Sequence, residues 1–395
     1  MKNLLLFILL SLVQNCFSQN EMYFGQESPG KEAQIFAPGI ISVNTRFDQQ
    51  STYTPDGAEF CFSVTNSAWN SSRIWYTKFE NGEWSKPKAA PFINSQGCDP
   101  FFSPDGNYLF YLRFEDVGVL YRFENVDGEW KNATRLDSSI TSEPSCSLSS
   151  TNNGTLYFCS DQPEANGGTG IYKSVLENGE YHSIEKVASP INDYVDTEPF
   201  IAPDESYLIF SSSKRPGGCG QDDLYISFNT ETGWTEPINL GQDINSNELE
   251  FTPYVSPDNQ YLFFTRRKAW GTTSPSNVYW ADASFIDSLK SVVTTDVGQA
   301  HMPTDIHLFQ NYPNPFNPKT TINYSIKNKS NVILTVINTT GQLVKTLVDG
   351  ERLAGLYSAT WDGEDEQNNR VSSGIYLYRL AIDNCIQCKK MVLMQ

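Results

Sequence analysis

One turn motif recurs through the first two thirds of the chain and constrains its fold more than any other feature. In its full form, as in "FSPDGNYLFY" at 102–111, an apolar run enters a Pro-Asp-Gly turn and an aromatic run leaves it. Five copies align, the third of them degenerate, at 53–62, 102–111, 149–158, 201–210 and 255–264. A period of about fifty residues is typical of architectures in which each repeat is one supersecondary unit.

Each copy predicts four short strands. Proline presets φ and glycine accepts the positive φ of a hairpin turn, so the motif joins the first strand to the second. A tyrosine-bearing third strand follows, and an anchor such as "ENGEW" (80–84) or "VDGEW" (126–130) opens a more polar fourth strand. Polarity that rises from the first strand to the fourth is what a β-propeller blade requires. We therefore expect an all-β propeller within residues 19–292.

The last copy lacks a fourth strand of its own. Residues 33–44 resemble the fourth strand of other copies, such as residues 84–95. If the beginning of the mature chain supplied the missing strand, the ring would close and its free edge would disappear. The pattern predicts five blades, with six as the alternative.

These repeats resemble a known family. The "SPDG…LYF" pattern, together with residues 211–227, is similar to the PD40, or TolB-like, β-propeller repeats of bacterial envelope proteins. The resemblance covers most of residues 45–285. It implies the fold but no particular ligand, because propellers host many unrelated functions.

The C-terminal region has a different composition. After a linker at 293–307, residues 308–395 contain short alternating strands separated by turns such as Thr340-Gly341 and Asp362-Gly363. This pattern predicts a small Ig-like β-sandwich.

Several motifs in that region strongly resemble the type A C-terminal sorting domain of the bacterial type IX secretion system. The residues that carry the resemblance include Asn311, Pro313, Asn314, Pro315, Phe316, Gly341, Gly374, Lys389 and Lys390. The resemblance implies a partner, the type IX secretion machinery, and passage across the outer membrane. Anchoring at the cell surface or release would follow, usually with removal of the domain.

The N-terminus reads as a secretory signal peptide over residues 1–18. Lys2 gives the positive start, residues 4–13 the apolar core, and Cys16 and Ser18 the small residues before a cleavage site. Lipidation of Cys16 is an alternative, although Asn15 is larger than the residue usual at that place. The apolar run is too short to span a bilayer, and no later run is longer. We expect an extracellular or cell-surface protein with no transmembrane segment after signal removal.

Charge and cysteines exclude other classes. A formal net charge of −18 repels nucleic acid, so no nucleic-acid partner is expected.

Eight cysteines leave an odd number after signal removal, which argues against a disulfide framework. Cys61 and Cys159 lie in apolar runs and are expected to be small buried hydrophobes. Cys385 and Cys388 form a lone CxxC that we interpret as ordinary strand residues. We interpret the acidic residues 362–368 as a solvated turn rather than a calcium site. Neither a metal nor a cofactor is expected.

Carboxylates precede the innermost strands. Asp99, Glu143 and Glu198 each stand just before a proline, and Glu250 lies close to the same place in the fifth copy. Innermost strands line the axis of a propeller, so these side chains could ring the mouth of the channel and bind a cation or polar ligand. The alternative is that they cap backbone groups or are solvated.

The long loops between second and third strands share one face of the expected ring. Two of them carry Trp69 and Trp270, which ring closure would bring together beside Arg73, Arg266 and Arg267. Exposed aromatic rings beside hydrogen-bond donors suit a sugar or a peptide. The alternative is that both indoles pack within their own loops.

No catalytic motif is present. The sequence contains no GxSxG, HExxH or phosphate loop, and none of its three histidines lies in such a pattern. We therefore expect a surface propeller that binds an extracellular glycan or protein. The alternatives are a glycan-acting hydrolase that uses two of the axial carboxylates, and a non-catalytic envelope scaffold.

Overall fold

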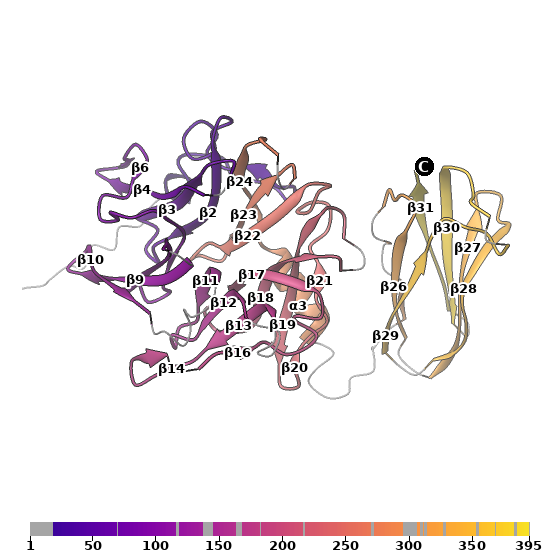
Figure 1. The fold of residues 1–395 in the computed structure, drawn as a ribbon. Coiled ribbons are helices and arrows are strands. Elements are labelled where there is room, and N and C mark those ends of the chain that lie inside the picture. Colours follow the sequence, from indigo (N-terminus) through magenta and orange to yellow (C-terminus); the bar gives the residue numbers. More distant parts are fainter. Residues whose placement is uncertain are drawn as a thin grey trace, which may run out of the picture.

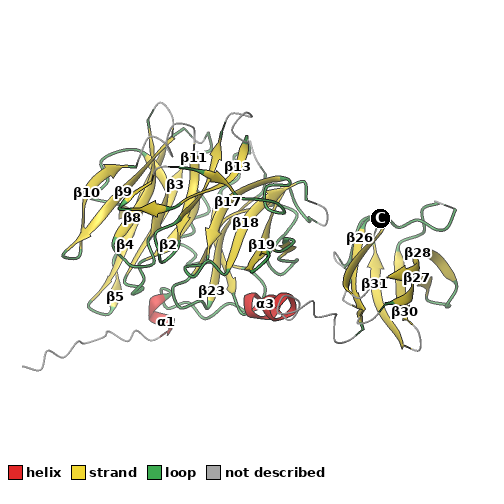
Figure 2. Cartoon of the chain, turned by 90° about the horizontal axis from the view of Figure 1, so that it is seen from below, coloured by secondary structure: helices red, strands yellow, loops and turns green. Residues whose placement is uncertain are grey.

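The protein consists of two modules built almost entirely from strands (Figures 1 and 2). The computed structural model describes residues 19–394 apart from 69, 116–117, 137–144, 163–167, 182, 216–217, 270–271, 295–305, 309–310, 312–313, 327–328, 353–354, 368 and 383–384. The first module spans residues 19–294 and the second residues 306–394.

Among the described residues, the first module contains five antiparallel groups, each with three long strands and an outer fourth strand; we call them the first to fifth blades. The first blade comprises β2 (Phe47–Tyr53), β3 (Glu59–Thr65), β4 (Ser72–Glu80), β5 (Glu83–Trp84) and β6 (Lys88–Ala89), and the second comprises β7 (Gly97–Phe102), β8 (Tyr108–Phe114), β9 (Gly118–Val126) and β10 (Glu129–Arg135). The third comprises β11 (Ser145–Ser150), β12 (Leu156–Asp161), β13 (Thr169–Ser174) and β16 (Glu185–Lys186), with the hairpin β14 (Leu176–Glu177) and β15 (Glu180–Tyr181). The fourth comprises β17 (Val195–Ile201), β18 (Tyr207–Ser213), β19 (Asp222–Thr230), β20 (Gly233–Trp234) and β21 (Ile238–Asn239), and the fifth comprises β22 (Leu249–Val255), β23 (Tyr261–Arg267), β24 (Ser276–Asp282) and β1 (Gln34–Ile35).

The blades are arranged in a closed ring. The first strand of each blade is innermost, and β2, β7, β11, β17 and β22 contact one another in cyclic order, with β22 returning to β2. Single parallel pairings, Asp222 with Leu249 and Ser276 with Phe47, also join the fourth blade to the fifth and the fifth to the first. This cyclic order of sheets defines a β-propeller.

The repeated turn is held by its own side chains. In the second blade, Ser103 Oγ donates to Asp105 Oδ1 at 2.5 Å, and that oxygen accepts the backbone N–H of Asn107 at 3.0 Å. Gly106 follows with a φ of 73°, which a glycine adopts without steric cost. The same bonds recur around Asp56, Asn153 and Asp258. The aspartates of the motif therefore stabilise the turn.

The aromatic anchor of the fourth strand ties blades together. Its hairpin has positive φ at both central residues, as at Asn81 (55°) and Gly82 (84°), which suits the twist of a two-residue turn. In the second blade, Trp130 Nε1 donates to Glu59 Oε2 of the first blade at 2.7 Å. The fourth blade's Trp234 likewise packs edge-on against Tyr157 of the third. Each of these contacts fixes an outer strand to the preceding blade.

The N-terminal segment completes the fifth blade, as the sequence predicts. Gln34 and Ile35 pair antiparallel with Trp280 and Tyr279 of β24. The segment begins with the short helix α1 (Gln19–Met22), after which Tyr23 is 1% exposed. Tyr23 stacks edge-on against Tyr261 with ring centroids 4.7 Å apart, and its hydroxyl donates to Asp258 Oδ2 at 2.9 Å.

Two expectations require correction. Cys159 is not a lone buried hydrophobe, because it forms a disulfide with Cys146, its direct partner across β11 and β12, with Cα atoms 5.2 Å apart. Cys61 is buried and has no disulfide, as expected. The second correction is a helix, α3 (Phe285–Thr294), that extends two residues into the expected linker. Ile286 is buried, and Phe285 and Leu289 pack on the core, so this helix is part of the propeller.

The second module is the expected sandwich of two sheets. One sheet contains β25 (His307–Leu308), β26 (Thr320–Ile326) and β29 (Gly355–Trp361); the other contains β27 (Ser330–Asn338), β28 (Leu343–Arg352), β30 (Gly374–Ile382) and β31 (Cys385–Leu393). Leu334, Trp361 and Tyr378 lie in the core between them.

Several residues of the expected sorting motif hold the C-terminal strand in place. The Asn314 side chain accepts the N–H of Val392 at 2.7 Å, and Phe316 is buried and exchanges backbone hydrogen bonds with Val392 and Met394. Buried Asn311 donates from Nδ2 to Thr320 Oγ1. Gly341 lies in the β27–β28 turn, Gly374 begins β30, Pro315 is exposed, and Lys389 and Lys390 lie in β31. Pro313 lies outside the described residues.

The packing of Tyr23 predicts that closure of the ring stabilises the whole propeller. Tyr23→Ala should lower the free energy of unfolding by roughly 3 kcal/mol, because it leaves a cavity between the N-terminal segment and the fifth blade. Tyr23→Phe should cost only about 1 kcal/mol, since it removes the Asp258 hydrogen bond alone. Chemical denaturation checks both values. Equal stability of wild type and Tyr23→Ala would contradict this role of the N-terminal segment.

Candidate functional site

The innermost strands share a β-bulge that forms a polar ring about the axis. At equivalent positions, five residues have positive φ, namely Gln50, Asp99, Ser147, Glu198 and Thr252. Pairing with the second strand shifts register at or beside each of them. A bulge of this kind re-aims a side chain. We call these five residues the axial ring.

Hydrogen bonds link the axial ring from blade to blade. Asp99 Oδ2 accepts the N–H of Ser147 at 3.1 Å, and Glu198 Oε2 accepts the N–H of Thr252 at 2.7 Å. The Ser147 hydroxyl in turn donates to Gln50 Oε1 at 3.2 Å. Two of the predicted carboxylates, Asp99 and Glu198, therefore belong to the axial ring, and each accepts a backbone N–H of another blade there.

Burial makes these two carboxyl groups weak acids. It raises the pKa of Asp99, and burial together with the charge of Asp99 raises the pKa of Glu198 to about 8. At neutral pH, Glu198 is therefore mainly protonated. Glu198 can therefore exchange a proton near neutral pH and contributes little fixed negative charge to the axial ring.

The other predicted carboxylates lie elsewhere. The equivalent of Asp99 is Thr252 in the fifth blade and Ser147 in the third. Glu250 stands two positions before its bulge, where its side chain binds Arg266 at 2.6 Å and the Ser246 hydroxyl at 2.6 Å. Glu143 lies outside the described residues. A proline directly follows the axial residue in the second, fourth and fifth blades, but not in the first and third.

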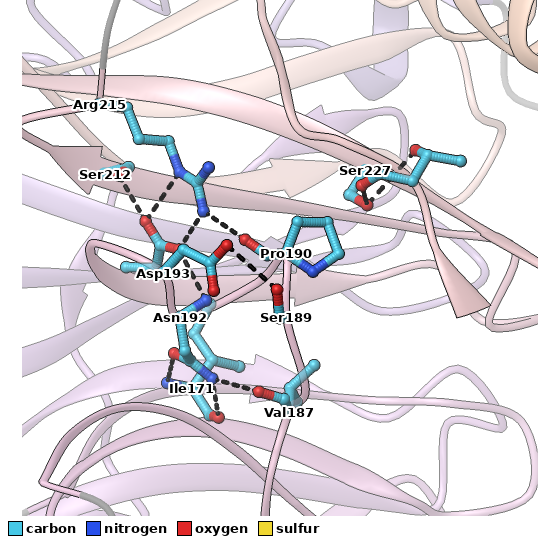
Figure 3. Close-up of polar contacts among 11 residues, drawn as sticks. Ile171, Val187, Ser189, Pro190, Asn192, Asp193, Ser212, Arg215 and Ser227 are labelled. Carbon is cyan, nitrogen blue, oxygen red and sulfur yellow. Dashed lines mark hydrogen bonds and ion pairs between the residues drawn. The ribbon is translucent and has the colours of Figure 1, made fainter.

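Arg266 belongs to an arrangement that occurs in three blades. In each, a buried carboxylate near the start of the innermost strand binds an arginine. The carboxylate also accepts a backbone N–H from the segment that connects this strand to the preceding blade, and the arginine donates to a backbone carbonyl of the same segment. In the fourth blade, Asp196 and Arg215 lie 2.6 Å apart, and Arg215 donates to the Pro190 carbonyl at 2.7 Å (Figure 3). The first and fifth blades use Asp48 with Arg46 and Glu250 with Arg266. These pairs fix the connections between blades.

The remaining residues of the expected ligand groove are Arg73, Arg267, Trp69 and Trp270. Arg267 is 1% exposed, donates to the Thr272 carbonyl at 2.6 Å and lies over the Phe47 ring. Arg73 is exposed on β4. Trp69 and Trp270 lie outside the described residues, so their grouping stays a prediction.

A central cavity opens on the opposite face, where the Pro-Asp-Gly turns lie. Its volume is about 580 Å³, within the range of pockets that enclose a small ligand. The ends of four innermost strands contribute the aromatic residues Tyr53, Phe101, Phe200 and Tyr254 to its lining. We call it the turn-face cavity.

Turns and helix α3 form the rim of the turn-face cavity. The turns contribute Pro55, Asn152 and Asp204 from three different blades, and α3 contributes Asp287 and Lys290. Sequence reasoning favoured the long-loop face and missed this site. The signal was present, because an aromatic residue stands just before the turn in several repeats, at the end of a strand that lines the axis.

A second hollow of about 770 Å³ lies between the N-terminal segment and the outer strands of the first blade. Phe24, Trp75, Phe79 and Trp84 line it. Phe24 and Trp84 stack with their centroids 4.3 Å apart, and Trp84 Nε1 donates to the Glu21 carbonyl at 2.8 Å. These rings pack the N-terminal segment against the first blade.

Within the part of the chain that the structure describes, no group of three or more His, Cys, Asp or Glu side chains could hold a metal ion. The described helices are all too short or too polar to cross a membrane.

Residues 318–384 match the family model of the FlgD Ig-like domain. No curated protein sequence matches the chain. The fold is thus that of a β-propeller followed by an Ig-like domain.

Similar solved structures include TolB from Acinetobacter baumannii, with 16% identity, a TM-score of 0.39 and coverage of 60% of this chain and 57% of that one. PorZ, a surface component of the type IX secretion system of Porphyromonas gingivalis, has 13% identity, a TM-score of 0.35 and coverage of 88% and 45%. An α-L-arabinofuranosidase from Lactobacillus brevis has 14% identity, a TM-score of 0.41 and coverage of 61% and 91%. The chain thus spans about half the length of the first two. The strand pairing of the chain itself, rather than these likenesses, defines its fold.

The raised pKa of Glu198 predicts a measurable pH dependence of stability. Because its folded pKa of about 8 lies above the ordinary 4.5, the folded state binds more protons between these values, and stability falls as pH rises through that window. Glu198→Gln keeps an oxygen for the Thr252 N–H but cannot ionise. Between pH 5 and pH 9, the loss of unfolding free energy should therefore be smaller in the variant by roughly 1–3 kcal/mol.

Denaturation at several pH values measures this difference, with Glu83→Gln, on the exposed outer strand β5, as the control. The control should keep the wild-type profile. Identical profiles for Glu198→Gln and wild type would show that Glu198 is already ionised in the folded protein.

Proposed function

We propose that the protein is a ligand-binding propeller delivered to the cell surface or the medium by the type IX secretion system. The ligand is an extracellular glycan or protein, and it binds in the turn-face cavity. The long-loop site expected from the sequence is replaced in this proposal, because Arg266 and Arg267, two of its three described residues, are engaged within the protein.

One observation carries the binding proposal, namely the position and lining of the cavity. Aromatic side chains from four blades meet at the axis, while turns and a helix form a polar rim around them. A concave site with an apolar floor and a few convergent polar groups is the usual form of a binding site. Because the floor belongs to the rigid inner strands, the site is formed before any ligand arrives.

Three features support export. The chain begins with a typical secretory signal pattern, and its C-terminal Ig-like domain carries the sorting motifs. The Cys146–Cys159 disulfide is the third, because disulfides persist in oxidising compartments outside the cytoplasm.

A tryptophan at the rim should block binding. Asn152 is exposed at the turn of the third blade, and its side chain lines the cavity. Asn152→Trp should weaken binding of a ligand found in a glycan and surface-protein screen by at least about tenfold, a loss of roughly 1.4 kcal/mol. Lys131→Trp, on the exposed strand β10 outside the cavity, is the control. Undiminished binding by Asn152→Trp, measured by calorimetry, would exclude the cavity as the site.

Export should depend on the second module. In a host with a type IX system, the full chain should become accessible to added protease or appear in the medium, whereas a chain that ends at residue 305 should stay in the periplasm. A reporter that carries both the signal peptide, residues 1–18, and residues 293–395 serves as the control and should be exported. Equal surface delivery of the truncated chain would contradict this route.

The second candidate is a glycan hydrolase, favoured by the meeting of Asp99 and Glu198 at the axis. Glycosidases need one protonated and one ionised carboxyl group flanking the scissile bond. Here burial raises both pKa values, and both side chains accept backbone hydrogen bonds of the ring. This arrangement suits a structural role better. Turnover of a polysaccharide that Glu198→Gln abolishes would favour the hydrolase.

A further inference from the structure

We propose that the ligand of the turn-face cavity is a protein segment that inserts a large apolar or aromatic side chain next to a lysine or arginine. This inference rests on the proposed binding function and narrows it from a glycan or protein to one chemical class. It concerns the cavity alone and is independent of the export route.

The floor of the cavity favours an apolar side chain. Phe101 and Phe200 both meet the Tyr254 ring edge-on, at centroid distances of 6.4 and 5.6 Å. Aromatic rings in this arrangement hold one another in place and present a fixed apolar surface. An inserted side chain of similar character would add further ring contacts and displace water from that surface.

The hydroxyl groups of the lining are largely engaged within the protein. Ser103 and Ser256 donate to the aspartates of their own turns and accept the N–H groups of Tyr108 and Tyr261. The Tyr254 hydroxyl both donates to the Tyr53 carbonyl and accepts the Tyr53 N–H. A sugar presents a hydroxyl on almost every carbon, and each one buried without a partner costs free energy. The cavity therefore suits a glycan less well than an apolar side chain.

The charge of the rim favours a neighbouring cation. Asp204 and Asp287 face a single ammonium group, Lys290. Although burial opposes it, hydrogen bonds from Ser206 and the charge of Lys290 lower the pKa of Asp204, so its carboxylate is ionised at neutral pH. The net charge around the cavity is also negative. Nine basic and seven acidic residues lie in 306–395, so of the formal charge of −18 on the whole chain, the remainder of the chain carries −20. Basic peptides are attracted to such a surface and acidic ones are repelled.

Helix α3 makes the site asymmetric. Ile286, Asp287 and Lys290 form one wall, whereas turns form the other sides. An apolar group and a carboxylate therefore lie side by side at one place on the rim. A ligand that carries an apolar residue next to a basic one would bind there in a single orientation.

Selection from a random peptide display library against the mature full-length protein tests the proposal. The enriched peptides should share an aromatic or large aliphatic residue beside lysine or arginine. A synthetic peptide of that consensus should lose at least about tenfold in affinity when its apolar residue becomes alanine. It should also lose affinity when its basic residue becomes glutamate.

Matched variants locate the contribution of charge. Asp204→Asn should fold normally, because Asn153 already occupies the same position in the turn of the third blade and makes the same backbone bond. Asp204→Asn combined with Asp287→Asn should weaken the consensus peptide roughly fivefold. Asp105→Asn, the same change in the second blade at a residue that does not line the cavity, should change affinity less than twofold.

The outcomes separate the two proposals. Peptides of polar or acidic consensus, or an oligosaccharide whose binding Asn152→Trp abolishes, would overturn the peptide inference and leave the binding function intact. Binding of the consensus peptide that Asn152→Trp does not affect would exclude the cavity for both. If no peptide is enriched, the inference fails, and the screen of glycans then decides the binding function alone.

Discussion

The structure depends on a single short pairing, that of β1 with β24. A β-propeller is stable because each sheet packs between two neighbours, and an open ring would leave one blade exposed on a face and along an edge. Here the closing strand pairs through Gln34 and Ile35, and backbone hydrogen bonds from Phe36 to Val278 and from Asp282 to Gly30 extend the joint on either side. The adjoining segment adds its own packing. Tyr23 enters the core of the fifth blade, and Phe24 stacks on Trp84 of the first. Side chains therefore secure a joint that backbone hydrogen bonds alone would hold weakly.

The repeat made most of the fold predictable. The turn motif fixes the junction of the first and second strands, because Ser, Asp and Gly each satisfy a separate requirement of the turn around Asp105. The missing fourth strand of the last copy indicated the role of residues 33–44. Helix α3 was not predicted, since Phe285–Thr294 contains Ser, Thr and β-branched residues that have little intrinsic helix preference. Packing of Ile286 on the core stabilises it instead.

The candidate site was harder to predict, because repeats do not specify which end of the axis is hollow. Asp99 and Glu198, each of which stands just before a proline, lie in the axial ring, whereas Glu250 does not stand before a proline and lies outside it. Its blade has Thr252 at the bulge, and the carboxylate two positions earlier serves a different purpose. In that blade too, the residue at the bulge stands just before a proline, Pro253, so the proline marks Thr252, and only the search for a carboxylate led to Glu250. The disulfide was not predicted, because the number of cysteines in a chain does not show which of them face each other across a hairpin.

The order of the strands along the chain also bears on when this protein can fold. The strand that closes the ring is made first, yet its partner, β24, is about 240 residues away and made much later. A nascent chain therefore cannot complete its core while it emerges from the ribosome. The export proposed above would suit such a molecule, because transport that begins at the N-terminus would keep the polypeptide unfolded until its last blade had crossed the membrane.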